Sequence, residues 1–337
     1  MYDKVMDLKN KVYQMFMLAP QKDELIDGGN LETALKLGLG GVIFFTRNIL
    51  SVEQVKNFTF KIKKSSLISP FIGIDEEGGR VERTENIFGG KKFLSAKYQA
   101  EKGANFVEQE TKNIAELIKS MGFNMNFAPV LDVNTNPKNP IIGERAYGET
   151  AEDVENFAVL AMKTYLKHKI IPVGKHFPGH GDASVDSHLT LPTLELSREE
   201  IENIHIKPFK TAIENGIPAV MVAHLLCPCL TDESVPSSLS CDVLWYLRNK
   251  LKFDGISVSD DMQMGALQSI DSIDAVVHGI KAGINLFLYR DSTDETIRLI
   301  ENIYERVSQD EKLIKKVEDS FELTQAVKLS YNDFLSV

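Results

Sequence analysis

The chain has 337 residues, and its 38 Lys and Arg against 48 Asp and Glu give a formal net charge of −10 at pH 7. Hydrophobic residues make up 43% and charged residues 26%, which is typical of soluble globular proteins and excludes disordered or collagen-like chains. The acidic balance disfavours nucleic acid and anionic membranes as partners, because both are bound through basic surfaces. No stretch approaches the ~18 apolar residues of a membrane span.

The first residues and the cysteine content bear on the cellular compartment. Residues 1–20 carry charges throughout and lack the apolar segment of a secretory signal. The three cysteines, Cys227, Cys229 and Cys241, form neither a disulfide framework nor paired C-x-x-C motifs for zinc. We therefore expect three reduced thiols packed as small hydrophobic side chains, in a cytoplasmic protein.

Eight short apolar runs alternate with longer amphipathic segments. Near-continuous apolar runs are typical of strands buried on both faces of a parallel sheet. This alternation predicts a (β/α)8 barrel, with a doubly wound open sheet as the alternative. We expect one catalytic domain over residues 1–337, with the barrel at about 12–307 and a C-terminal helical extension, about 308–337, packed on it. The predicted strands are residues 12–18, 41–46, 71–75, 125–133, 170–176, 218–224, 255–260 and 284–290.

Helices are predicted between these runs from apolar residues that recur on one helical face. Ser-x-x-Glu/Gln sequences at Ser51 and Ser197 are typical of helix starts, because the hydroxyl accepts a hydrogen bond from a free backbone N–H. The periodic sets are Val154, Phe157, Ala158, Ala161 and Tyr165; Ile114, Leu117, Ile118 and Met121; and Ile297, Ile300, Tyr304 and Val307.

Charged side chains stand where six of the apolar runs end, and the carboxyl ends of barrel strands are where active sites form. The solvation of a strand end would explain any one of these charged side chains, but six runs that end in the same way favour a shared functional site. For Asp132 and Arg290, pairing with a neighbouring residue to orient the loops is as good an interpretation as a direct role in the site. The residues are Asp75, Asp132, Lys175 with His176, His224, Asp260 with Asp261, and Arg290.

Residues 175–188, KHFPGHGDASVDSH, form a loop rich in His, Gly and Asp. Metal binding is disfavoured, because Pro178 and Gly179 break any helix that would place His176 and His180 on one face. Acid/base chemistry by Asp186-x-His188 is favoured, since a carboxylate two residues away can fix the imidazole tautomer. A histidine held for packing is the simpler alternative.

Two further segments carry chemistry. Asp260 and Asp261 are neighbours at a strand end, so their side chains are expected to point to opposite sides and only one can face the barrel axis. The one that faces the axis is a candidate nucleophile. Asp261 is expected to cap a helix that begins at Met262. Residues 73–83 combine a strand-end carboxylate, a Gly-Gly turn and two arginines. The carboxylate offers hydrogen-bond acceptors and the arginines offer donors, which is a combination suited to binding a neutral polyol such as a sugar. There, Glu76 and Glu77 are expected to orient the arginines.

Five segments resemble family 3 glycoside hydrolases, and within them the compact bacterial β-N-acetylglucosaminidases of cell-wall recycling. The likeness runs from about Gln14 to Arg290 and is strongest in KHFPGHG followed by Asp186-Ser-His188. The other segments are GVIFFTRN, GIDEEGGRVERT, PVLDVNTNPKNPIIGERAYG and GISVSDDMQMGA.

The resemblance implies an exo-acting retaining β-N-acetylglucosaminidase that needs no metal or cofactor and acts on a small glycan. It implies Asp260 as nucleophile, His188 as acid/base and Asp186 as its paired carboxylate. We expect no counterpart of the second domain of many relatives, so the barrel's own loop supplies the acid/base. The residues matching those that hold the terminal N-acetylglucosamine are Asp75, Arg83, Arg145, Lys175 and His176.

Several alternatives to this activity stay open at this point. They are a β-glucosidase or phosphate-using phosphorylase of the same family, a metal-dependent barrel hydrolase and a non-catalytic sugar-binding barrel. The aglycone and the oligomeric state are not predicted, and a monomer is compatible with the sequence.

Overall fold

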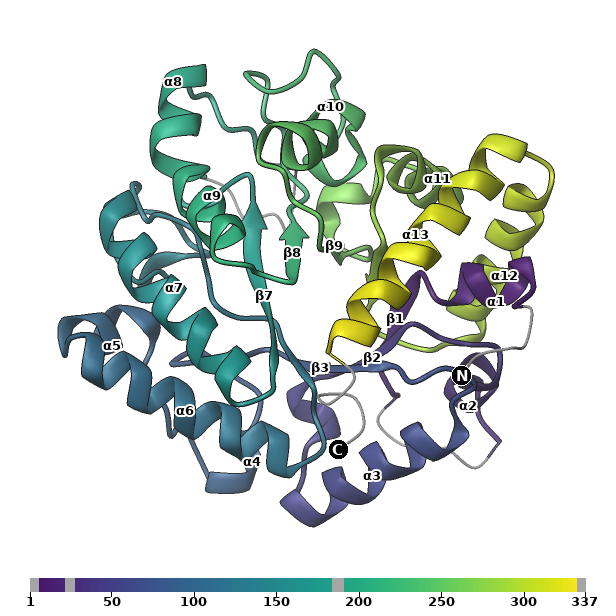
Figure 1. Cartoon of the computed structure of the whole chain (residues 1–337), viewed down its shortest axis with the longest axis horizontal. Helices are drawn as coiled ribbons and strands as arrows, with labels where there is room; N and C mark the ends of the chain where they lie inside the picture. The colour runs from purple at the N-terminus through teal and green to yellow at the C-terminus, as the bar shows by residue number, and fades with distance from the viewer. Residues whose placement is uncertain (1–5, 22–27, 184–190, 332–337) are drawn as a thin grey trace.

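The protein is described from a computed structural model that covers residues 6–21, 28–183 and 191–331. Eight parallel strands close into one barrel, so the predicted barrel is confirmed and the open sheet is wrong (Figure 1). In barrel order the strands are β1 (Phe16–Leu18), β10 (Leu286–Tyr289), β9 (Ile256–Asp261), β8 (Ala219–Val222), β7 (Ile171–Phe177), β6 (Met125–Asn126), β3 (Phe71–Ile74) and β2 (Gly41–Phe44).

Each predicted apolar run contains a strand, but most strands are shorter than their runs, and β1 and β6 are shortened the most. Val12 and Tyr13 belong to the preceding helix α1, so β1 starts only at Phe16. The run 125–133 gives the two-residue β6, after which Pro129 lacks the N–H that would continue the ladder. A single bridge between Val130 and Lys175 keeps the extended chain beside β7.

Helices surround the barrel, as Figure 1 shows. All three predicted periodic sets fall on helices α6, α7 and α12, except that Met121 lies just beyond the end of α6. The helices are α1 (Leu8–Tyr13), α2 (Asn30–Lys36), α3 (Val52–Ser65), α4 (Glu85–Phe88), α5 (Ala96–Glu101), α6 (Ala104–Ser120), α7 (Ala151–Lys167), α8 (Arg198–Glu200), α9 (Lys207–Glu214), α10 (Cys241–Trp245), α11 (Ser272–Ala282), α12 (Asp294–Ser308) and α13 (Glu311–Ser330).

Both predicted helix starts are present. Ser51 accepts a hydrogen bond from the Gln54 N–H and begins α3. Ser197 accepts from the Glu200 N–H while the Glu200 carboxylate accepts from the Ser197 N–H, a complete capping box. The helix expected from Met262 is absent: residues 262–264 form a turn, and the next α-helix, α11, begins at Ser272.

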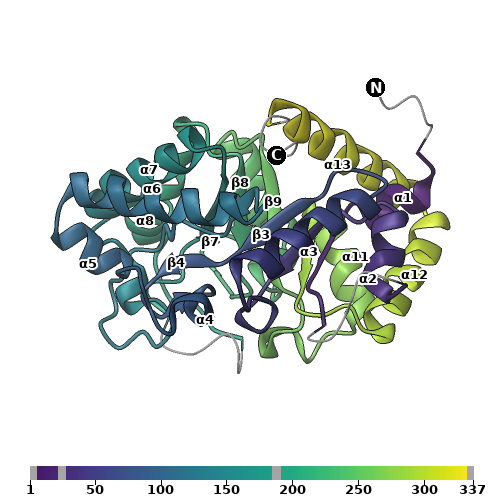
Figure 2. The same cartoon turned by 90° about the horizontal axis from the view of Figure 1, so that it is seen from below.

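Helix α13 covers the end of the barrel where the strands begin (Figure 2). Val327 and Tyr331 pack against the apolar residues inside the barrel. Lys328 donates to Gln14 Oε1 over 3.0 Å and lies 4.8 Å from the centre of the Phe71 ring, and burial lowers its pKa to about 7. The opposite end of the barrel, where the strands finish, is therefore the end at which a functional site can form.

Two other features concern the surface. No helix in the described ranges has the length and apolar character needed to cross a membrane. All three cysteines are free; Cys227 is buried and Cys229 half-buried, but Cys241 is exposed, so the expectation of three packed thiols is wrong for Cys241.

Candidate active site

The polar residues predicted at strand ends lie at the carboxyl end of the barrel. Asp75 follows β3 directly, Lys175 and His176 are among the last three residues of β7, and Asp260 and Asp261 end β9. Asp132, His224 and Arg290 follow β6, β8 and β10. Asp186 and His188 lie outside the described residues.

Lys175 is the centre of a buried charge cluster. Its Nζ lies 2.8 Å from Asp75 Oδ1 and 2.5 Å from Glu77 Oε1, and the residue is 1% exposed. Arg83 Nη2 lies 3.4 Å from the other Asp75 oxygen. Burial raises the pKa of Asp75, but the charges of Lys175 and Arg83 outweigh it and leave the pKa below its usual value. Asp75 is therefore ionised and accepts hydrogen bonds.

Arg145 and Glu77 complete the cluster through a bidentate ion pair. Arg145 Nε donates to Glu77 Oε2 and Nη2 to Oε1, each over 2.8 Å. Burial opposes ionisation of Glu77, but Arg145 and Lys175 hold its pKa far below the usual range. With Arg83, three cations face two carboxylates, so the cluster carries one net positive charge.

His176 is fixed by Asp132. Its Nδ1 lies 2.6 Å from Asp132 Oδ2, and because a carboxylate only accepts, Nδ1 carries the proton. Arg145 Nη2 faces Nε2 at 3.4 Å, consistent with Nε2 as an acceptor. Asp132 also accepts from the backbone N–H of His180 over 2.6 Å. Asp132 thus ties the end of β7 to the loop that follows it, which agrees with its interpretation as an orienting residue.

A second set of buried hydrogen bonds fixes the hairpin of β4 (Glu76–Gly78) and β5 (Val81–Glu82). Glu76 accepts from the Thr84 hydroxyl over 2.6 Å and from the Arg83 backbone N–H over 2.8 Å. Asn126 pairs with the Glu76 backbone through both its amide groups, at 3.0 and 2.9 Å. Glu76 therefore orients the backbone of Arg83, whereas Glu77 binds the side chain of Arg145. Burial raises the pKa of Glu76 to about 7.

Asp260 and Asp261 have different partners: Asp260 Oδ1 accepts from the Asp261 backbone N–H over 2.8 Å. Asp261 pairs with Arg290 Nε at 2.8 Å and accepts from the Gln263 N–H, so it braces a turn and does not cap a helix. His224 lies beneath this strand end: it is fully buried, and its Nε2 donates to the Asp261 carbonyl over 3.2 Å. The burial of the His224 ring lowers its pKa.

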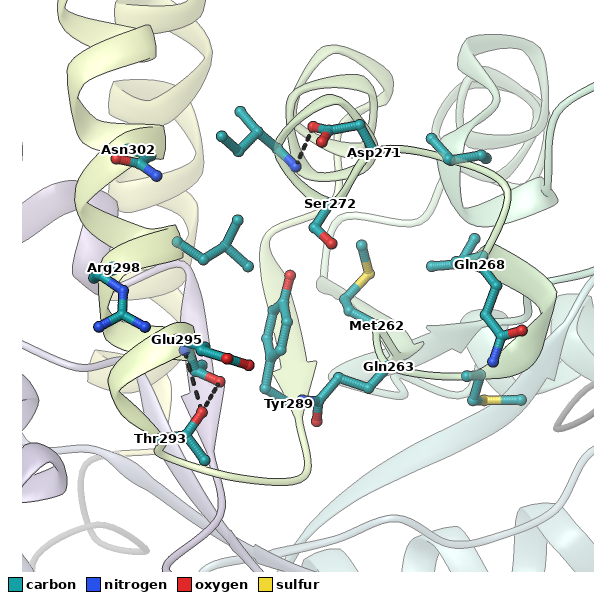
Figure 3. A pocket seen from close by; sticks show the side chains of 16 residues that line it. Met262, Gln263, Gln268, Asp271, Ser272, Tyr289, Thr293, Glu295, Arg298 and Asn302 are labelled. Carbon is teal, nitrogen blue, oxygen red and sulfur yellow. Dashed lines mark hydrogen bonds between the residues drawn. The ribbon is translucent and has the colours of Figure 1, made fainter.

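A cavity of about 520 Å³ lies on the outside of the barrel wall beside these residues (Figure 3). It is bordered by the segment after Asp261, by α11 and by α12. Tyr289 points into it, and this residue belongs to the outward face of β10, because Leu286 and Leu288 pack inside the barrel. The strand β10 therefore separates this cavity from the charge cluster at the barrel mouth.

Some contacts of the site were not predicted. No pattern in the sequence indicates that Glu77 binds Lys175, 98 positions away, or that Asn126 pairs with the Glu76 backbone. The backbone role of His180 was also missed, although its place in the loop with Pro178 and Gly179 was a signal for a fixed turn. Within the described residues, no group of three His, Cys, Asp or Glu side chains is arranged to hold a metal ion.

Comparison with known proteins assigns the family. The model of the glycosyl hydrolase family 3 N-terminal domain matches residues 7–326, and the chain belongs to this family. β-Hexosaminidase A of Pseudoalteromonas piscicida is 30% identical over 81% of the chain and 48% of its own length. β-Hexosaminidase of Neisseria meningitidis is 34% identical over 67% of the chain and 64% of its own length.

The chain is also similar to a solved structure from the same family. The family 3 β-N-acetylglucosaminidase from a Paenibacillus species superposes with a TM-score of 0.90 at 32% identity, covering 99% of this chain and 64% of that one. The chain thus spans about half of one of these relatives and a little under two thirds of the other two.

Proposed function

We propose that the protein is an exo-acting retaining β-N-acetylglucosaminidase that hydrolyses terminal, non-reducing β-linked N-acetylglucosamine from peptidoglycan- or chitin-derived fragments. The observation that carries the proposal is the charge cluster of Asp75, Lys175 and Arg83 at the carboxyl end of a family 3 barrel. Such a cluster offers fixed donors and acceptors to sugar hydroxyls. The names of the relatives, β-hexosaminidase and β-N-acetylglucosaminidase, support this substrate class.

In this mechanism Asp260 attacks the anomeric carbon while His188 donates a proton to the departing glycosidic oxygen. A glycosyl ester on Asp260 results. His188 then takes a proton from water, whose oxygen attacks the anomeric carbon and releases Asp260 and the sugar with its configuration retained. Asp186 would keep His188 in the right tautomer.

The sugar would be held by Asp75, Arg83, Arg145, Lys175 and His176. Asp75 and Arg83 are the members with exposed side-chain surface, 15% and 29%, so they are the ones proposed to touch hydroxyls directly. Lys175 and Arg145 are nearly buried and would act partly through the two carboxylates they hold.

The catalytic unit is proposed to be one domain, with the barrel at about residues 12–307 and the helical extension at 308–337, acting in the cytoplasm. The packing of Val327 and Tyr331 on the barrel interior supports the first part. Fractionation of the native host, followed by immunodetection, tests the second.

The activity is tested by turnover of an aryl β-N-acetylglucosaminide, with and without phosphate, while NMR follows the anomer first released. We expect β-N-acetylglucosamine at a rate that phosphate and a chelator leave unchanged. Release of a sugar 1-phosphate would make the protein a phosphorylase, and faster turnover of the β-glucoside would make it a β-glucosidase. Loss of turnover on chelation would indicate a metal-dependent hydrolase, and no turnover at all a sugar-binding barrel.

A further inference from the structure

Two of the three cysteines lie in one tight turn after β8. The Sγ atoms of Cys227 and Cys229 are 3.6 Å apart. The turn over residues 227–230 is closed by a hydrogen bond of 2.9 Å from the Leu230 N–H to the Cys227 carbonyl, with Pro228 at its second position. Pro228 restricts the backbone between the two cysteines, so the turn holds both sulfur atoms on the same side.

The two thiols have different surroundings. Cys227 is 1% exposed, whereas Cys229 is half-buried and reachable from solvent. The hydrogen bond from Cys227 lowers the pKa of Cys229 to about 7, and the charge of Arg198 acts in the same direction against the effect of burial. Glu202, which pairs with Arg198, weakens this effect. The pKa of Cys227 is raised by the same hydrogen bond and by burial.

We propose that Cys227 and Cys229 form a redox-active dithiol, which a hydroperoxide converts into an intramolecular disulfide. The Cys229 thiolate attacks one peroxide oxygen, which breaks the O–O bond and gives a sulfenic acid and hydroxide. The Cys227 sulfur then attacks the Cys229 sulfur, and the sulfenic oxygen leaves as water with the Cys227 proton. Hydroxide takes up the proton first lost by Cys229, so two thiols and hydrogen peroxide yield a disulfide and two waters.

The turn is also a structural junction. The backbone of Leu226, next to Cys227, accepts from the Leu194 N–H over 2.9 Å and donates to the Pro192 carbonyl over 2.8 Å. The Cys229 carbonyl accepts from Arg198 Nη1 over 3.0 Å. Closing the disulfide therefore acts on the contact that joins the loop after β8 to residues 192–198.

The test uses the full chain and does not depend on its catalytic activity. The reduced protein is treated with hydrogen peroxide, quenched by alkylation, and examined by intact mass and peptide mapping. We expect loss of two alkylatable thiols, a cross-link between Cys227 and Cys229, and full reversal by dithiothreitol. Cys241→Ser is the matched control and should behave like the wild type.

Single variants identify the two roles. Cys229→Ser should lower the rate of thiol loss at least ~10-fold, because the reactive thiolate is gone. Cys227→Ala should leave a sulfenic acid on Cys229 that a dimedone probe traps; circular dichroism checks that this buried substitution folds. The proposal is wrong if the wild type keeps three alkylatable thiols, if the cross-link includes Cys241, or if Cys229→Ser reacts as fast as the wild type.

Discussion

The Arg145 guanidinium and the Glu77 carboxylate form two parallel hydrogen bonds of 2.8 Å, and Glu77 Oε1 also pairs with Lys175 Nζ. One carboxylate thus compensates two buried cations, one at the end of β7 and one in the segment between β6 and α7. Such a group is expensive to remove, because its partners are left charged without water.

Glu77→Gln should therefore destabilise the protein by about 3 kcal/mol or more, within the range for breaking a buried ion pair. Because the native pKa of Glu77 lies below its unfolded value, its stabilisation is complete above the unfolded pKa of 4.5 and is lost as the pH falls. Urea unfolding at several pH values should show the wild type and variant converging in acid. Glu85→Gln, on an exposed ion pair with Lys91, is the control and should change little.

Glu76 should show the opposite dependence. Its native pKa, about 7, is above the unfolded value of 4.5, so the neutral carboxyl favours folding at low pH. Stability should fall as the pH rises through that range, by up to about 3 kcal/mol. Glu76→Gln should flatten this slope, because the amide stays neutral while its oxygen still accepts from the Arg83 and Thr84 N–H groups. An unchanged slope in urea unfolding would assign the titration to another group.

Asp260→Asn should lower kcat by several orders of magnitude without unfolding the protein, because a neutral amide cannot form the glycosyl ester. A slow fluorosugar substrate, followed by peptide mapping, should label Asp260. Asp261→Asn is the matched control, since Asp261 binds Arg290 and the Gln263 N–H. Label on Asp261 or Asp132 would refute the assignment of the nucleophile.

Arg83→Ala should raise KM about tenfold, with a smaller loss in kcat, as sugar contacts tighten in the transition state. Arg298→Ala is the control and should leave both constants unchanged, because this exposed residue of α12 borders the cavity outside the barrel wall and not the charge cluster. Lys175→Ala should raise KM too but also lower stability, because Asp75 and Glu77 would lose their shared cation. Wild-type kcat/KM in Arg83→Ala would remove this residue from the sugar site.

His188→Ala should slow substrates with poor leaving groups far more than activated aryl glycosides, which depart without a proton. A histidine begins near pKa 6.5, and the Asp186 carboxylate should raise it by favouring the protonated form. If the protonated imidazole is the acid, as proposed, activity should fall as the pH rises through that pKa. Asp186→Asn should move this alkaline limb of kcat/KM to lower pH. Equal loss on both substrate types would make His188 structural; His278→Ala on α11 is the control.

The barrel could be predicted because each strand is a local apolar run and the alternation with helices has one simple closed solution. The positions of Asp75, Lys175, His176 and Asp260 followed, since strand ends meet at one rim. Contacts such as Glu77 with Lys175 could not be predicted, because they depend on the path of the β4–β5 hairpin, which carries no apolar pattern. The helix expected from Met262 was wrong: Asp261 does accept from the Gln263 N–H, as a capping residue would, but its other oxygen binds Arg290 and the chain closes only a turn there.

The placement of α13 has a consequence for how the chain folds. The first strand, β1, pairs with β10 (Phe16 with Phe287), and within the described ranges residues 327–331 cover the barrel floor near Gln14 and Phe71. A chain made from its N-terminus can pair β1 with β2 early, but the other edge of β1 and the apolar floor lack these partners until the segment some three hundred residues later has been made. Contacts so distant in sequence slow folding. We therefore expect the nascent chain to expose apolar surface for most of its synthesis, and a truncation before Val327 should leave the barrel floor uncovered and prone to aggregation.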